Sequence, residues 1–269
     1  MFRWLRRFRA LPSIPDAAWQ ATLTRYPFLS HLTEVERVRL RTLTAGFLSE
    51  KEFHGAHGFA ITDEVALAIA AQAVLPLLHL KGGLTWYDDF VGVVVHPSEV
   101  VAQRKTTDTA GVVHEYEEVV AGEAMDRGPM MLSWQDVLAS SITGDSGYNV
   151  VVHEFAHKID MRNGMADGCP PLPPGFAGTA NAREARAAWL AALQAAYESF
   201  REQTIVAERF GGEAPWLDPY GAESISEFFA VACEAYFVNR PRFAQEFPAL
   251  LELFDEFFLA EHGDQATQA

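Results

Sequence analysis

One short motif in the sequence has residue types and a spacing that suit metal chemistry. His153 and His157 flank Glu154 in a His-Glu-x-x-His pattern. Residues four apart on a helix share one face, so both imidazoles can bind a single Zn²⁺ at about 2.0–2.1 Å. Glu154 follows the first histidine and points beside the metal, where a carboxylate can take a proton from bound water. The motif therefore predicts a zinc site that supports hydrolysis.

The neighbours of this motif are apolar, which indicates that its helix is buried. Val150, Val151, Val152, Phe155 and Ile159 surround the two histidines. Buried polar groups need partners, because leaving them unpaired costs several kcal/mol or shifts their ionisation. A hydrogen-bonded pair of core histidines is the alternative to a metal site. We favour the metal site, because two histidines and a glutamate seldom share a buried face.

A catalytic zinc needs a third protein ligand and one open position. Three downstream glutamates are candidates, namely Glu223, Glu227 and Glu234. Glu227 precedes Phe228 directly, so it is the candidate that we expect to be held against the core. The same residue also ends a Ser224-x-x-Glu227 capping box, in which it would only close the start of a helix. Spacing alone leaves ligand and cap equally open, with Glu223 as the first alternative ligand and Glu234 as the second.

The elements that position these residues are predicted from periodicity and turn signals. Helical patterns cover residues 19–32, 34–48, 62–75, 148–160, 182–208, 225–238 and 241–258. Strand patterns cover residues 84–87, 92–96, 112–116, 118–120 and 129–133. Residues 163–181 are rich in Gly and Pro and are predicted to form a loop. This order favours a mainly helical α+β domain with a small sheet of about four strands, mixed or mostly antiparallel.

Composition narrows the functional class. The chain of 269 residues has 36 acidic and 21 basic side chains and a formal net charge of −15, so direct binding of nucleic acid is not expected. Two cysteines, Cys169 and Cys233, exclude a disulfide framework and fit a reducing compartment. The basic start is followed by Pro12 and Pro15 rather than by an apolar segment, and no run suits a membrane span. We therefore expect a cytoplasmic protein.

Two blocks of the sequence resemble a known family. HEFAHKIDMRNG, from His153, and DPYGAESISEFFAVACEAYF, from Asp218, resemble the Mlc titration factor A family of bacterial zinc peptidases. GLTWYDDFVGVVVHPSEV and GEAMDRGPMMLSWQDVLAS are similar to the sheet region of that family. The resemblance covers residues 28–258. The catalytic motifs are also similar to those of lethal-factor-type metallopeptidases.

The resemblance implies a zincin-like fold and a role for each motif residue. His153 and His157 correspond to ligands of one Zn²⁺ per chain, and Glu227 corresponds to the third ligand. Glu154 corresponds to the general base. Tyr220 corresponds to a tyrosine that donates a hydrogen bond to the oxyanion, although a surface tyrosine in a turn is the alternative.

The same resemblance implies a function. It predicts aminopeptidase-like hydrolysis of short peptides, together with binding of the glucose-responsive transcriptional repressor Mlc. The alternative is a regulatory protein without catalysis that sequesters a DNA-binding repressor. A purely structural zinc site is disfavoured, because only three convincing ligands are present. We expect a basic arm at 1–16, a peptidase domain at 17–262 and a flexible tail at 263–269.

Other residues are weaker candidates. Asp160 or Glu234 could accept hydrogen bonds from the ligand imidazoles, and a solvated carboxylate is an equal alternative for each. His96 and His114 are expected to be ordinary strand residues. The spacing does not support Cys169 as an inhibitory thiolate.

Two expectations concern the surroundings of the motif. Arg162 and Asn163 are expected to close the helix that carries the histidines. The segment 128–133 is expected to form the sheet edge along which an extended peptide lies.

Overall fold

The computed structural model describes residues 13–98, 100–107, 113–120, 122–124, 128–142 and 145–259. Most of the expected basic arm, and the whole of the expected tail at 263–269, lie outside the described residues. Among the described helices, none is both long and apolar enough to cross a bilayer.

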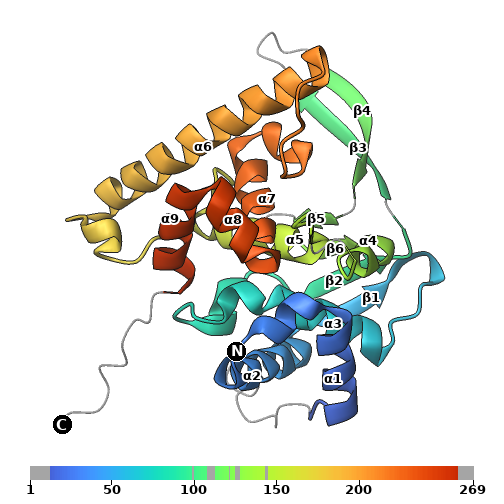
Figure 1. Ribbon diagram of the computed structural model, residues 1–269. Helices are drawn as coiled ribbons and strands as arrows, with labels where there is room; N and C mark the ends of the chain where they lie inside the picture. The colour runs from blue at the N-terminus through green and yellow to red at the C-terminus, as the bar shows by residue number, and fades with distance from the viewer. Residues whose placement is uncertain are drawn as a thin grey trace, which may run out of the picture.

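Helices make up most of the described chain (Figure 1). The N-terminal helices lie at one end of the molecule and the C-terminal helices at the other, with α5 between them. The helices are α1 Asp16–Arg25, α2 Glu34–Glu50, α3 Asp63–Ala73, α4 Trp134–Ala139, α5 Val150–Asp160, α6 Ala182–Phe210, α7 Ile225–Val238, α8 Arg240–Glu246 and α9 Pro248–Phe258.

Local signals predict several helix boundaries well. The bounds predicted for α7 coincide with the observed ones, and Thr62 caps α3 by accepting a hydrogen bond from the Val65 amide. Prolines divide two segments that were predicted as single helices. Pro248 begins α9 and separates it from α8, and Pro27 begins a separate 3-10 turn after α1. Proline fixes its own φ and lacks an N–H, so it suits the first turn of a new helix.

The sheet is mixed, which agrees with the predicted α+β class. Its strands are β1 Glu52–Gly55, β2 Gly92–His96, β5 Gly122–Ala124 and β6 Met130–Ser133, in the order β1-β2-β6-β5. β1, β2 and β6 run parallel, and only β5 pairs antiparallel with its neighbour. Of the two predicted alternatives, the mixed sheet is therefore confirmed and the mostly antiparallel sheet is wrong. Long connections, which include α3 between β1 and β2, allow parallel pairing.

A separate antiparallel hairpin projects from the sheet region (Figure 1). It consists of β3 Val100–Thr107 and β4 Val113–Val120. The patterns predicted as separate strands at 112–116 and 118–120 thus belong to one strand, while β1 and β3 were not predicted. The predicted strand at 84–87 is instead a 3-10 turn, Gly83–Tyr87. Its aromatic residues serve core packing, since Tyr87 is fully buried and its hydroxyl donates to the Ala73 carbonyl.

Helix α5 passes through the centre of the core. All of its residues are buried, and it packs against α7, α3 and the edge strand β5. Phe155 on α5 contacts the rings of Phe47, Tyr87 and Phe90 edge-on, with centroids 5.0–5.9 Å apart. A helix held in this way offers fixed positions for the side chains on its other face.

Candidate metal centre

The start of α5 is fixed by a buried cap. The Asn149 side chain accepts a hydrogen bond from the Val152 amide at 2.9 Å, and its Nδ2 donates to Gln72 Oε1 on α3 at 2.8 Å. After α5, a 3-10 turn at Met161–Asn163 leads to Gly164, whose φ of 91° suits glycine. The expectation that residues 162 and 163 close the helix agrees with this turn. These end contacts set the position of the motif between them.

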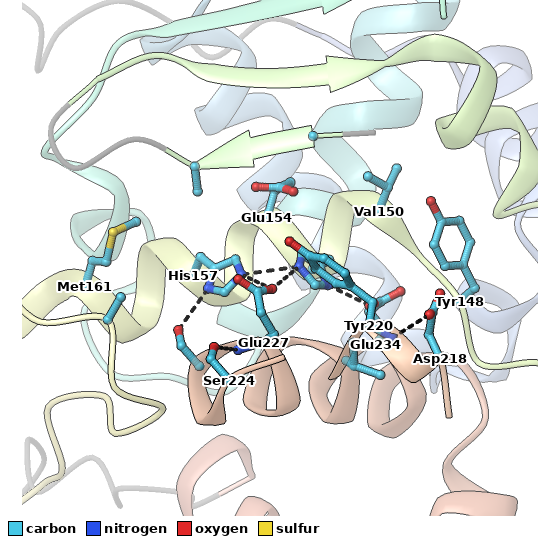
Figure 2. Close-up of a pocket in the computed structure, with 16 residues that line it drawn as sticks. Tyr148, Val150, Glu154, His157, Met161, Asp218, Tyr220, Ser224, Glu227 and Glu234 are labelled. Carbon is cyan, nitrogen blue, oxygen red and sulfur yellow. Dashed lines mark hydrogen bonds and ion pairs between the residues drawn. The ribbon is translucent and has the colours of Figure 1, made fainter. Parts of the chain in front are cut away.

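Three side chains of α5 and α7 converge on one point (Figure 2). His153 Nε2 and His157 Nε2 lie 3.2 Å apart, and each lies 3.1 Å from Glu227 Oε2. Three ligands of a tetrahedral ion with bonds of about 2.0–2.1 Å lie about 3.3 Å from one another. Lone pairs that face one point need a cation or shared protons between them. Two nitrogens and one oxygen in this triangle fit a divalent metal such as zinc.

Glu227 lies in the first turn of α7, three residues after the cap Ser224, and its side chain faces the two histidines. The Ser224 hydroxyl caps α7 by accepting a hydrogen bond from the Glu227 amide at 3.1 Å. The Glu227 carboxylate does not complete a capping box and instead faces the two imidazoles. Glu223, the first alternative, is exposed and is not part of the converging group. The geometry thus favours Glu227 as the ligand.

Glu234 contacts the opposite side of the His153 ring. Its Oε1 lies 2.7 Å from His153 Nδ1, and its Oε2 accepts a hydrogen bond from the Asn149 amide. A carboxylate on Nδ1 leaves the Nε2 lone pair free to face the metal position. Glu234 therefore acts as the hydrogen-bond acceptor that we considered, rather than as a ligand.

Asp160 reaches the second histidine through a residue that the sequence analysis missed. Ser226 Oγ donates to Asp160 Oδ2 at 3.1 Å and lies 3.4 Å from His157 Nδ1. The Gly168 amide also donates to Asp160 Oδ2, at 2.8 Å. No spacing rule singles out Ser226, because its contact depends on how α7 packs against α5.

Burial and pairing shift the acid–base properties of these groups. Burial opposes protonation of His153, but its bonds to Glu227 and Glu234 dominate and hold its pKa well above the usual range. Burial would raise the pKa of Glu227, yet the two histidines lower it far below the usual range. Burial raises the pKa of Glu154 and of Asp160 to about 6 in each case. The site thus concentrates charged groups that a divalent cation would balance.

The triangle opens into a cavity of about 570 Å³. Glu154 lines it on one side and is directed toward the sheet, away from Glu227 (Figure 2). Tyr220 lies on another side, in the turn Pro219–Ala222, with its ring centroid 5.9 Å from that of His153. Gly122 and Ala124 of β5 also line the cavity. A ligand in this space would therefore contact the metal position, a carboxylate and a phenol together.

The expected sheet edge at 128–133 needs correction. Its strand, β6, lies between β2 and β5 and so has both of its edges paired. Within the described sheet, β5 is the edge strand beside α5. The three-residue β5 has too short a pattern to be recognised in the sequence.

The remaining candidates lie outside the converging group. His96 ends β2 and is buried, with its ring centroid 5.5 Å from that of His57, and the side chain of His114 is not described. Cys169 is buried, its Sγ donates to the Pro170 carbonyl at 3.7 Å, and burial raises its pKa to about 11. Its thiol is therefore protonated at neutral pH, and Cys169 is not part of the metal site.

The fold and the site define a class of protein. A buried His-Glu-x-x-His helix, joined by a glutamate from a later helix beside a sheet edge, is the arrangement of a metallopeptidase. The chain belongs to the family of glucose-regulated metallo-peptidases M90, whose model matches residues 2–259. The resemblance found in the sequence is thereby confirmed.

Curated relatives match almost the whole chain. Mlc titration factor A of Escherichia fergusonii is 34% identical over 259 residues, which cover 96% of this chain and 91% of the relative. The proteins of the same name from Salmonella agona and Shigella dysenteriae are 33% and 34% identical, with the same coverage.

Proposed function

We propose that this protein hydrolyses peptide bonds with one Zn²⁺ held by His153, His157 and Glu227. The observation that carries the proposal is the triangle of two imidazole nitrogens and one carboxylate oxygen, with edges of 3.1–3.2 Å. Three protein ligands leave one position for water or substrate, as catalytic zinc sites require.

The other residues of the cavity supply the proton transfers. Bound zinc would polarise the scissile carbonyl and lower the pKa of water. Glu154 takes the proton of the attacking water and passes it to the leaving amine. A pKa of about 6 keeps this carboxylate ionised at neutral pH and close to the range that favours proton transfer. The Tyr220 hydroxyl donates a hydrogen bond to the oxyanion of the tetrahedral intermediate.

The substrate is a short peptide that is cleaved from its amino end. Within the described sheet, β5 has an open edge, to which an extended peptide can add main-chain hydrogen bonds. Asp218 lines the same cavity and supplies a negative charge, which suits a free ammonium group. The family resemblance supports the same aminopeptidase preference.

Metal content and turnover, measured on matched variants, test this proposal. Wild type should hold about one zinc per chain by mass spectrometry and should hydrolyse a chromogenic aminoacyl substrate, but not its N-acetylated form. Glu154→Gln should keep the metal and lose turnover, because it removes only the proton acceptor. Glu227→Ala should lose both. Turnover that survives in Glu154→Gln contradicts the mechanism, and zinc that survives in Glu227→Ala contradicts the ligand set.

A second function is favoured by the relatives. Proteins named Mlc titration factor A share 33–34% identity with 96% of this chain. We infer that this protein also binds the repressor Mlc in the cytoplasm, where its net charge of −15 suits a basic DNA-binding partner. A pull-down with purified Mlc, with and without chelator, tests this inference. Capture in both conditions supports binding separate from the metal, and no capture in either contradicts it.

A further inference from the structure

Gly122 on the edge strand β5 lies directly against the side chain of Glu154. A methyl group on Gly122 would lie 2.5 Å from Glu154 Oε1, 2.6 Å from Cγ and 2.7 Å from Cδ. All three distances are shorter than real carbon contacts allow. The strand and the carboxylate can approach this closely only because residue 122 has no side chain.

The requirement for glycine here comes from the neighbour and not from the backbone. Gly122 is not among the residues with positive φ, so an alanine could adopt its backbone conformation. Gly92 in β2 of the same sheet provides a comparison. A methyl group there would lie 3.4 Å from Pro129 Cβ, which is an ordinary contact. The two glycines therefore differ mainly in what faces them.

Rotation of the Glu154 carboxylate alone cannot relieve the clash with a methyl group at position 122. Its Cγ is as close to the added methyl group as its oxygen is, and the position of Cγ is set by χ1 alone. A change of χ1 would move the carboxylate to another position on a helix whose residues are all buried. The alternative is a shift of β5, which the pairing of Gly122 with Leu132 and of Ala124 with Met130 resists.

We propose that Gly122 is a positioning residue, whose missing side chain leaves the space that holds the Glu154 carboxylate in place beside the metal position. Its catalytic consequence rests on the proposed function, in which Glu154 is the general base. The steric relation between Gly122 and Glu154 does not depend on that function. The Glu154 side chain is directed toward the sheet, away from Glu227 (Figure 2), and the three atoms nearest to a methyl group at position 122 all belong to Glu154. A side chain at position 122 should therefore disturb the base and spare the ligands.

A stability cycle in the metal-free protein tests the steric relation without any activity. Gly122→Ala should lower Tm by about 5 °C, because inserting a methylene into a packed site is destabilising. In a Glu154→Ala background, which removes Cγ and the carboxylate, the same substitution should have almost no effect. Gly92→Ala should leave Tm nearly unchanged in both backgrounds. A shift of equal size in both backgrounds, including none in either, overturns the proposal.

Kinetics of the zinc-loaded enzyme test the catalytic consequence. Gly122→Ala should keep one zinc per chain and lower kcat about 100-fold, the loss that a misplacement of about 1 Å can cause. KM should change little, and Gly92→Ala should behave as wild type. Zinc loss in Gly122→Ala, or an unchanged kcat, overturns the positioning role. If wild type itself shows no turnover, the proposed function fails, while the stability cycle still decides the steric relation.

Discussion

The two ring nitrogens of His153 have different partners, and this difference determines which nitrogen can bind a metal. Nε2 faces Glu227 at 3.1 Å, while Nδ1 lies 2.7 Å from Glu234. Glu234 also accepts the Asn149 amide at the start of α5, so one buried carboxylate orients both the ring and the helix that carries it. Such a partner raises the basicity of the ligand and fixes its tautomer.

Glu234→Gln should therefore weaken zinc binding about 10- to 100-fold. The amide is neutral, and its oxygen can replace only one of the two carboxylate oxygens, so its NH2 group would face either the imidazole or the Asn149 amide, which both donate. Competition with a chromogenic chelator measures the affinity. Glu223→Gln is the matched control, because Glu223 is exposed and lies outside the converging group. Equal zinc affinities in Glu234→Gln and Glu223→Gln would show that Glu234 does not support His153 as a metal ligand.

At the scale of elements, α5 depends on the cap at its start. Asn149 is fully buried and satisfies the Val152 amide while it donates to Gln72 on α3. The cap thus links the metal-site helix to the N-terminal part of the core. Asn181, the cap of α6, makes a similar bond to the Glu184 amide but is exposed.

Asn149→Ala should cost about 2 kcal/mol of unfolding free energy, because it leaves buried polar groups unpaired. Asn181→Ala should cost about 1 kcal/mol or less, since water can replace its side chain. Urea unfolding that is followed by circular dichroism measures both values. Equal costs for the two variants would contradict the linking role of Asn149.

At the scale of the whole molecule, the candidate ligands join two helices that are distant in the chain. His157 and Glu227 are 70 residues apart in sequence, yet their ligand atoms lie 3.1 Å apart. A metal that binds only the folded protein stabilises it by mass action. The site should therefore couple metal binding to the stability of the whole core.

Zinc at about 100 times its Kd should raise Tm by about 5–10 °C, which corresponds to about 2.7 kcal/mol for a chain of this size. Chelation should reverse the shift. Calorimetry of wild type and Glu227→Ala, each with zinc and with chelator, measures it. Glu227→Ala should respond weakly or not at all. A wild-type Tm that does not change when zinc is added would argue against a metal site formed by α5 and α7 together.

Local patterns in the sequence predicted much of the fold and the motif. The bounds of α7 were correct, and the helical pattern predicted from residue 62 begins at the cap of α3, because caps and helical periodicity act within a few residues. The His-Glu-x-x-His spacing also predicted that His153 and His157 share a face, since helix geometry alone requires it. The family resemblance added Glu227 to this pair.

Contacts between distant segments were decided only by the tertiary structure. Spacing left Glu223, Glu227 and Glu234 open as third ligand. The packing of α7 on α5 distinguishes them, because Glu227 faces His153 Nε2 and Glu234 faces His153 Nδ1. Glu223 is exposed. The parallel strands and the edge position of β5 likewise depend on long connections. Gly122 and Glu154 lie close together, although no pattern in the sequence links their two segments. A pattern along the chain encodes which face a side chain takes, whereas packing decides what that face meets.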